Sequence, residues 1–108
     1  MNSFFQNIKK RWKKYDINTQ MANIGAEFDR ALRWRKKDKK QSLDAFYRAI
    51  YLLDETINDK KNHHRLKEIC RLKEILIDYF LGDNIYHSDE KFFQKYFLFY
   101  NFTANQNR

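Results

Sequence analysis

The sequence predicts an all-α protein, an antiparallel up-and-down bundle of four main helices with a short basic helix at the N-terminal end. Proline is absent and only two glycines occur among the 108 residues, which favours long uninterrupted helices over turn-rich β architecture. Apolar residues recur at helical spacing in five segments, separated by short polar stretches. Because short loops make consecutive helices antiparallel neighbours, we expect a single helical-bundle domain over residues 1–108.

The first expected helix covers residues 3–15, inside a basic amphipathic segment at 1–16. Phe5, Ile8, Trp12 and Tyr15 form one apolar stripe, and Ser3 can cap the helix. The other face is strongly cationic: Lys9, Lys10, Arg11, Lys13 and Lys14.

The second and third helices are expected at 19–37 and 41–58, with a charged, exposed loop at 36–40 between them. Asn18 or Thr19 is the expected N-cap of the second helix. Gly25 lies on its apolar face, where glycine costs up to about 1 kcal/mol relative to alanine. We therefore expect another helix to approach closely at Gly25.

The fourth helix is expected at 63–81, with Gly82 as its C-terminal glycine. The residues 88–90, Ser-Asp-Glu, supply a cap and first-turn acids for a fifth helix, which should end near Asn101. Residues 103–108 are then expected to form a frayed tail.

The fifth helix contains an unusual aromatic run, in which seven of the eleven residues 92–102 are aromatic. Six of them, at positions 92, 93, 96, 97, 99 and 100, cover an arc of roughly 160°, which exceeds the apolar stripe of about 100° that an ordinary surface helix shows. Phe97 and Phe102 lie at the margins of the arc, and we predict that they make an intermolecular contact. The alternative is that they close over the N-terminal helix.

The net charge of +8 predicts an anionic partner: nucleic acid, an acidic protein surface or, since the basic first helix is amphipathic, a phospholipid surface. Trp12 and Trp34 lie within the two main basic clusters and could stack on bases; the alternative is that the clusters are solvated helix faces and the tryptophans are core. The predicted nucleic-acid-binding residues are Lys9, Lys10, Arg11, Lys13, Lys14, Arg30, Arg33, Arg35, Lys36, Lys37, Lys39 and Lys40.

Charged residues that lie among the regularly spaced apolar residues of the helices are expected to form structural ion pairs that fix the register of the helices. Arg48 has Asp44 and Glu55 at suitable spacing on its own helix. A second predicted group consists of Arg71, Glu74 and Asp78, one turn apart on the fourth helix.

No catalytic constellation is found in the sequence, and we predict no cofactor and no metal site. Glycine-rich phosphate loops, nucleophile elbows and clustered metal ligands are missing. The single cysteine, Cys70, is expected to be a buried small hydrophobe.

Several strings resemble a set of short uncharacterised prokaryotic all-α proteins. The strings are residues 20–25, 48–49, 65–68, 78–80, 83–84 and 95–97, spread over nearly the whole chain. More distantly, the small bundle with charged interior residues is similar to HEPN domains, which implies a ribonuclease, a toxin–antitoxin component or a nucleotidyltransferase partner. The HEPN nuclease motif, an arginine followed after four to six residues by a histidine, is not found: Arg48 precedes His63 by fifteen positions and Arg71 precedes His87 by sixteen.

The leading expectation is a non-enzymatic, cytoplasmic, basic helical-bundle protein that binds nucleic acid, RNA above all, or an acidic partner, and that forms a homo-oligomer or docks a heteromeric partner. The alternatives are the HEPN-like roles and a purely structural homo-oligomer. No stretch approaches the length of about 18 apolar residues of a membrane span, so no integral membrane segment is expected.

Overall fold

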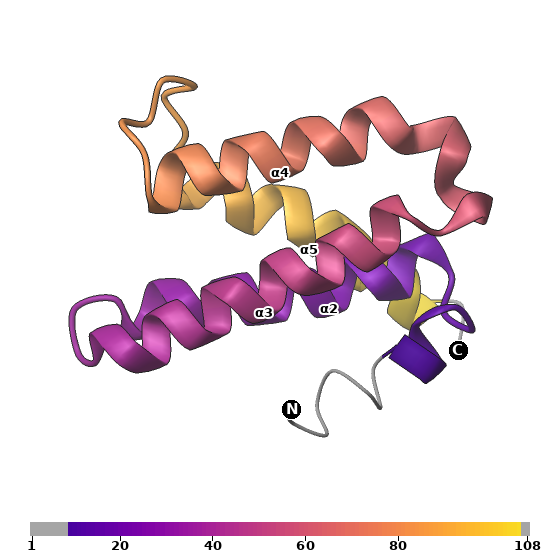
Figure 1. Cartoon of the computed structure of the whole chain (residues 1–108), viewed down its shortest axis with the longest axis horizontal. Helices are drawn as coiled ribbons and strands as arrows, with labels where there is room; N and C mark the ends of the chain where they lie inside the picture. The colour runs from indigo at the N-terminus through magenta and orange to yellow at the C-terminus, as the bar shows by residue number, and fades with distance from the viewer. Residues whose placement is uncertain (1–8, 107–108) are drawn as a thin grey trace.

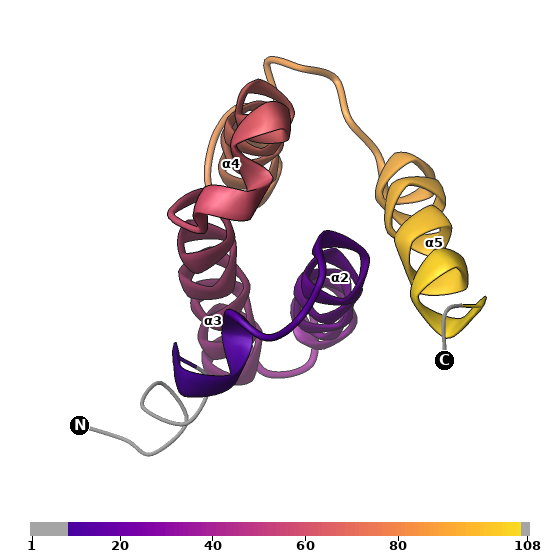
Figure 2. The same cartoon turned by 90° about the vertical axis from the view of Figure 1, so that its right-hand side faces the viewer.

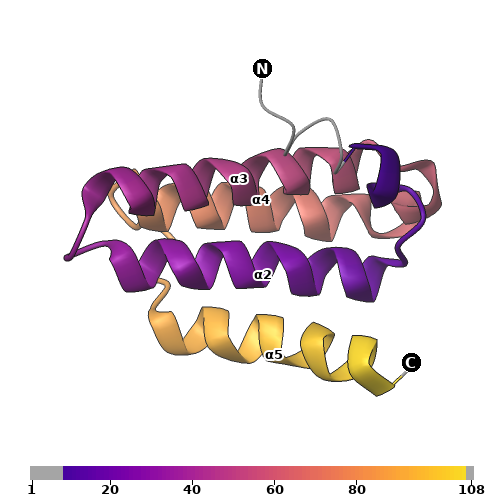
Figure 3. The same ribbon diagram turned by 90° about the horizontal axis from the view of Figure 1, so that it is seen from below.

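The structure is a computed structural model that describes residues 9–106, with side chains as far as Ala104 (Figure 1). Within this range, residues 9–12 form a helical turn and no strand occurs. The successive long helices alternate in direction, so the predicted all-α up-and-down bundle is confirmed (Figure 3). The elements are α2 (Ile17–Trp34), α3 (Lys39–Ile57), the 3₁₀ helix η1 (Lys60–Arg65), α4 (Leu66–Phe80) and α5 (Glu90–Gln106).

Aspartates cap the starts of α2, α3 and η1. Asp16 accepts a hydrogen bond from the Thr19 backbone N–H at 2.8 Å, so α2 begins two residues before the predicted start and neither Asn18 nor Thr19 is its cap. Asp38 accepts from the N–H of Lys40 and Gln41, which places Lys39 and Lys40 inside α3 rather than in a loop. Each aspartate satisfies backbone donors that have no partner within the helix.

The two ends of the chain differ from the predicted bounds. The helical turn at 9–12 gives way to a turn closed by the Lys14 N–H on Arg11 O at 3.0 Å, and residues 3–8 of the predicted first helix lie outside the described range. At the other end, α5 continues to Gln106 and Ala104 is buried, so the predicted frayed tail is wrong for residues 103–106. Residues 107 and 108 lie outside the described range.

Phenylalanine rings from four helices meet at the centre of the bundle. α2 occupies the middle of the fold, between α3 and α5, and α4 packs on α3 (Figure 2). Phe46 of α3 stacks on Phe80 of α4 with ring centroids 4.3 Å apart, and Phe28 of α2 meets Phe93 of α5 edge-on at 4.9 Å. Such pairs add roughly 0.5–1.5 kcal/mol each beyond the apolar area that they bury.

Gly25 allows α5 to approach α2 closely, as its position in the sequence predicted. A Cβ atom at Gly25 would lie 2.6 Å from Cγ of Phe97, closer than side chains pack. Phe97 is consequently only 8% exposed and packs on α2. The alternative contact with the N-terminal helix falls largely on residues 3–8, which lie outside the described range. Phe97 is thus mostly covered by its own chain, whereas Phe102 remains exposed, and the intermolecular contact of the two residues stays a prediction.

Candidate nucleic-acid interface

Two basic segments that are far apart in the sequence meet at one end of the bundle, which we call the amino pole (residues 9–14 and 60–61). The Lys61 ammonium donates a hydrogen bond to the Lys13 backbone oxygen at 2.9 Å across 48 positions of sequence. Figure 3 shows the start of α2 and the η1 segment at the same end. The amino pole holds seven basic residues, all exposed: Lys9, Lys10, Arg11, Lys13, Lys14, Lys60 and Lys61.

A buried polar network holds the amino pole in place. Trp12, 1% exposed, donates its indole N–H to Thr56 Oγ1 at 2.9 Å, and that hydroxyl donates to Leu52 O at 2.9 Å. The Gln20 amide donates to Trp12 O at 2.9 Å and accepts from the Asn62 amide at 2.8 Å. Every buried side-chain nitrogen and oxygen in the described part of the chain has a partner. A fully satisfied network of this kind rigidifies the elements that it joins.

Asp59 links this network to the cationic surface. Its carboxylate accepts hydrogen bonds from the Lys61 ammonium and, at 3.1 Å, from the Gln20 amide. Partial burial acts to raise the pKa of Asp59, but these hydrogen bonds outweigh burial and hold the pKa below its ordinary value. Asp59 thus remains an anion that fixes Lys61 at the edge of the pole.

The second basic cluster forms the opposite end of the bundle, which we call the carboxy pole (residues 33–40). Arg35 donates to Phe80 O at 3.2 Å, and its guanidinium lies 4.9 Å from the centroid of the Phe80 ring. Trp34 is 38% exposed beside it. Four lysines of the pole are exposed and make no ion pair with another described residue: Lys36, Lys37, Lys39 and Lys40.

The two remaining predicted arginines already pair with carboxylates on α2. Arg30 lies 2.7 Å from Glu27, and Arg33 lies 3.1 Å from Asp29. These exposed pairs are screened by solvent and each is worth at most about 1 kcal/mol. Arg30 and Arg33 therefore add less free positive charge to the carboxy pole than their sequence positions indicated.

The predicted binding residues therefore lie on two surfaces rather than one. The 18 residues of α2 separate the poles, about 27 Å at the helical rise. Trp12 is core, as the alternative interpretation of the two tryptophans predicted, and Trp34 is the tryptophan that remains accessible. The contribution of residues 60–61 to the amino pole was not predicted. Their proximity to residues 9–14 depends on Gln20 and Asn62, and polar residues such as these are expected on the surface of a helix when only the sequence is known.

A cluster of polar side chains joins α4 to α5, whose ribbons stand apart in Figure 2. Glu68 accepts hydrogen bonds from Tyr96 at 2.7 Å, from Tyr100 at 2.8 Å and from Arg65 at 2.9 Å. Desolvation acts to raise the pKa of Glu68, but the three donors outweigh it and the pKa is lowered. Burial and the hydrogen bond to Glu68 raise the pKa of Tyr96 far above its ordinary value. We call the cluster of Arg65, Glu68, Tyr96 and Tyr100 the clamp, because it joins α4 to α5 through hydrogen bonds in which both tyrosines are protonated donors.

The predicted ion pairs are only partly formed. Arg48 pairs at 3.2 Å with Glu27 on α2 and so connects α2 to α3.

In the second predicted group, Arg71 and Glu74 form an exposed pair at 3.5 Å. Asp78 makes no ion pair with a described residue; it accepts from the backbone N–H groups of Ile85 and Tyr86 and shapes the α4–α5 loop. Cys70 is exposed, contrary to its predicted burial.

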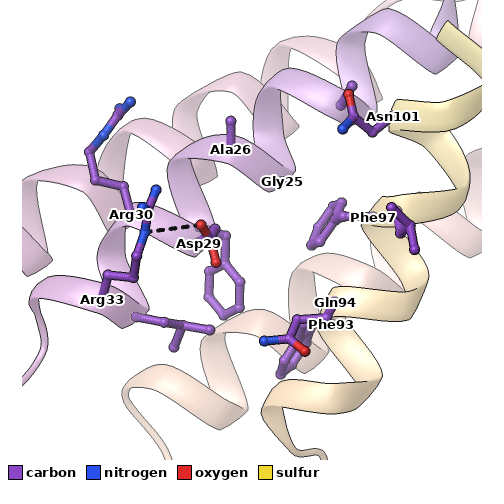
Figure 4. Close-up of a pocket in the computed structure, with 13 residues that line it drawn as sticks. Gly25, Ala26, Asp29, Arg30, Arg33, Phe93, Gln94, Phe97 and Asn101 are labelled. Atoms are coloured by element: carbon purple, nitrogen blue, oxygen red, sulfur yellow. Dashed lines mark ion pairs between the residues drawn. The ribbon is translucent and has the colours of Figure 1, made fainter. Parts of the chain in front are cut away.

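A groove of about 460 Å³ lies between α2 and α5 (Figure 4). Small residues of α2, namely Ala22, Gly25 and Ala26, form part of one wall, which continues along α2 to Arg33. Phe97 and Leu98 of α5 form part of the other wall. Sequence reasoning did not predict this groove, although the closely spaced small residues 22, 25 and 26 are its signal.

Comparison of the chain with protein-family models, curated proteins and solved structures finds no match in any of the three. Within residues 9–106, no helix has the length and apolar character needed to cross a bilayer. Over the same range, no group of three or more histidine, cysteine and acidic side chains is arranged to hold a metal ion.

Proposed function

We propose that this protein binds nucleic acid, with structured RNA as its first ligand, without catalysing a reaction. The observation that carries the proposal is the amino pole, where folding brings residues 60–61 against residues 9–14 and a buried network fixes both. Seven exposed basic residues lie there together with two aspartates, Asp16 and Asp59, and each aspartate caps the start of a helix.

The binding mechanism is neutralisation of phosphates with release of condensed counterions. Lysine ammonium groups on a rigid surface supply charge without reading base edges, so the affinity depends on salt far more than on sequence. At the carboxy pole, Trp34 beside Lys36 and Lys37 offers a stacking surface for an unpaired base, which favours RNA with loops over a plain duplex.

A titration of fluorescent structured RNA across salt concentrations tests the proposal. Removing one lysine that neutralises a phosphate should reduce the slope of log K against log [salt] by about 0.7–0.9. The amino-pole variant is Lys13→Gln with Lys60→Gln, and the carboxy-pole variant is Lys36→Gln with Lys37→Gln. The control, Lys73→Gln with Lys95→Gln, removes the same charge from positions inside α4 and α5 rather than from the helix ends that form the poles.

The expected result is a reduced slope for the pole variants and a smaller change for the control. Three outcomes would overturn the proposal: absence of binding at low salt, binding independent of salt, or an equal loss of affinity in all three variants. Equal losses of RNA affinity would mean that the net charge of the protein alone attracts the RNA, without a defined binding surface.

The HEPN-like ribonuclease remains an alternative prediction that no observation in the structure favours. It predicts RNA cleavage that disappears in Arg48→Ala or Arg71→Ala, and a wild-type protein without cleavage activity removes it.

A further inference from the structure

The exposed side of α5 carries a ridge of large apolar side chains, which we define as Leu98, Phe99 and Phe102. They are 63%, 61% and 60% exposed, respectively, although Phe93, Phe97 and Tyr100 of the same helix are buried. Residues 98 and 102 are four apart and therefore project from the same side of the helix. A ridge of this size needs an explanation, because single exposed apolar residues are common on protein surfaces but contiguous groups are not.

The α2–α5 groove lies directly beside the ridge. Leu98 belongs to both, because it lines the groove and begins the ridge. The α2 side of the groove includes Ala22, Gly25 and Ala26, whose small side chains leave room for a bulky group to approach the helix backbone, next to the charged residues Asp29, Arg30 and Arg33. A protrusion and a matching hollow thus occupy one face of one molecule.

We propose that a second copy of this chain covers this face, with the ridge of each copy seated in the groove of the other. A two-fold interface requires one patch that is complementary to itself, and a ridge beside a groove meets that requirement. The proposal is independent of nucleic-acid binding.

The distribution of charge favours this face for self-association. Two molecules of net charge +8 repel each other, and most of the exposed lysines lie at the two poles. The α2–α5 face lies along the side of the bundle, between the poles (Figure 3). Arg30 and Arg33 also line the groove, but they pair with Glu27 and Asp29, and the side chains of the ridge itself are apolar.

The available area fits a weak dimer. Aromatic side chains present roughly 150–250 Å² each, so at these exposures the ridge contributes about 350 Å² per copy. With the groove walls of both copies, the buried total is roughly 1,000 Å², the lower limit for a specific interface. We therefore expect a monomer–dimer equilibrium rather than a permanent dimer.

Sedimentation of the full chain tests the proposal, in high salt and after nuclease treatment so that bound nucleic acid does not contribute mass. The wild type should show a concentration-dependent shift from monomer to dimer below about 1 mM, the range in which weak affinities are measured. The ridge variant, Leu98→Lys with Phe102→Lys, should stay monomeric. Its control is Ile85→Lys, which places a lysine on the most exposed apolar side chain of the α4–α5 loop and should dimerise like the wild type.

A groove variant separates ridge-in-groove pairing from general apolar association. Ala26→Lys keeps the ridge but blocks the groove, and it should also be monomeric. Apolar association through the ridge alone would leave this variant able to dimerise like the wild type. A wild type that is monomeric up to about 1 mM, a ridge variant that still dimerises, or a groove variant that still dimerises would each overturn the proposal.

Discussion

Gly25 and Phe97 set the distance between α2 and α5. The Phe97 ring occupies the position that a side chain at residue 25 would need, with its Cγ atom 2.6 Å from an ideal Cβ. Glycine at this position is therefore required by packing and not by backbone conformation, since no positive φ occurs at a described glycine.

Gly25→Ala should destabilise the protein by about 1–3 kcal/mol, because overpacking outweighs the gain of up to about 1 kcal/mol in helix propensity. Urea unfolding followed by circular dichroism measures the change. Phe97→Leu in the Gly25→Ala background should recover part of the stability, because it shortens the side chain that clashes. A neutral or stabilising Gly25→Ala would contradict this account of the α2–α5 packing.

Thr56→Val should cost about 1–3 kcal/mol, although the two side chains have nearly the same shape. The substitution leaves the buried indole N–H of Trp12 without an acceptor, and the cost is that of an unsatisfied buried donor. Thr103→Val is the matched control, because the Thr103 hydroxyl bonds only to Phe99 O within its own helix. Similar decreases in stability for the two variants would show that the network contributes little.

Acid should weaken the clamp between α4 and α5. The pKa of Glu68 is lower in the folded chain than its ordinary value of 4.5, so its stabilising effect is full above that pH and is lost as pH falls through the folded pKa. Glu68→Gln should remove this part of the acid dependence, measured as the urea midpoint from neutral pH down to about pH 3. Glu55→Gln on α3 serves as the control, and an unchanged acid dependence in Glu68→Gln would contradict the prediction.

The same cluster predicts the opposite behaviour in alkali. The pKa values of Tyr96 and Tyr100 are raised above 10.0, so the stability they contribute is complete below that pH and declines at higher pH. Tyr96→Phe should flatten the alkaline limb, and ultraviolet titration of the phenol groups reports the pKa shift directly.

Asp38→Asn should leave stability nearly unchanged but tighten RNA binding. Asparagine caps helices about as well as aspartate, and the substitution removes a negative charge from the carboxy pole. Asp38→Ala should tighten binding equally but reduce stability by about 1 kcal/mol. If neither variant changes the RNA affinity, the carboxy pole does not contact phosphate.

The helices could be predicted because apolar spacing alone shows which face of each one is buried. Their starts were less accurate, since Asp16 and Asp38 look like loop charges until their backbone partners are known. The orientation of α5 could not be predicted, because its aromatic arc is wider than the stripe that one neighbouring helix can cover. The approach of Phe97 to Gly25 decides which part of the arc is buried, and it leaves Leu98 and Phe99 exposed.

The candidate site was predicted residue by residue but not as a surface. Both main basic clusters are exposed as expected, yet the assembly of the amino pole depends on Gln20, Thr56 and Asn62. These residues are polar side chains at buried positions. Their partners come from different segments of the chain, so no local pattern reveals them.

The buried network at the amino pole also selects one arrangement among many. A core of phenylalanine rings tolerates several registers, because apolar surfaces of similar size can exchange neighbours at small cost. Sliding α2 against α3 by one turn would separate Gln20 and Asn62, and it would strip Trp12 of its acceptor. Burial of the aromatic core favours collapse of the chain, and the hydrogen bonds of Gln20, Thr56 and Asn62 favour one packing arrangement over the others.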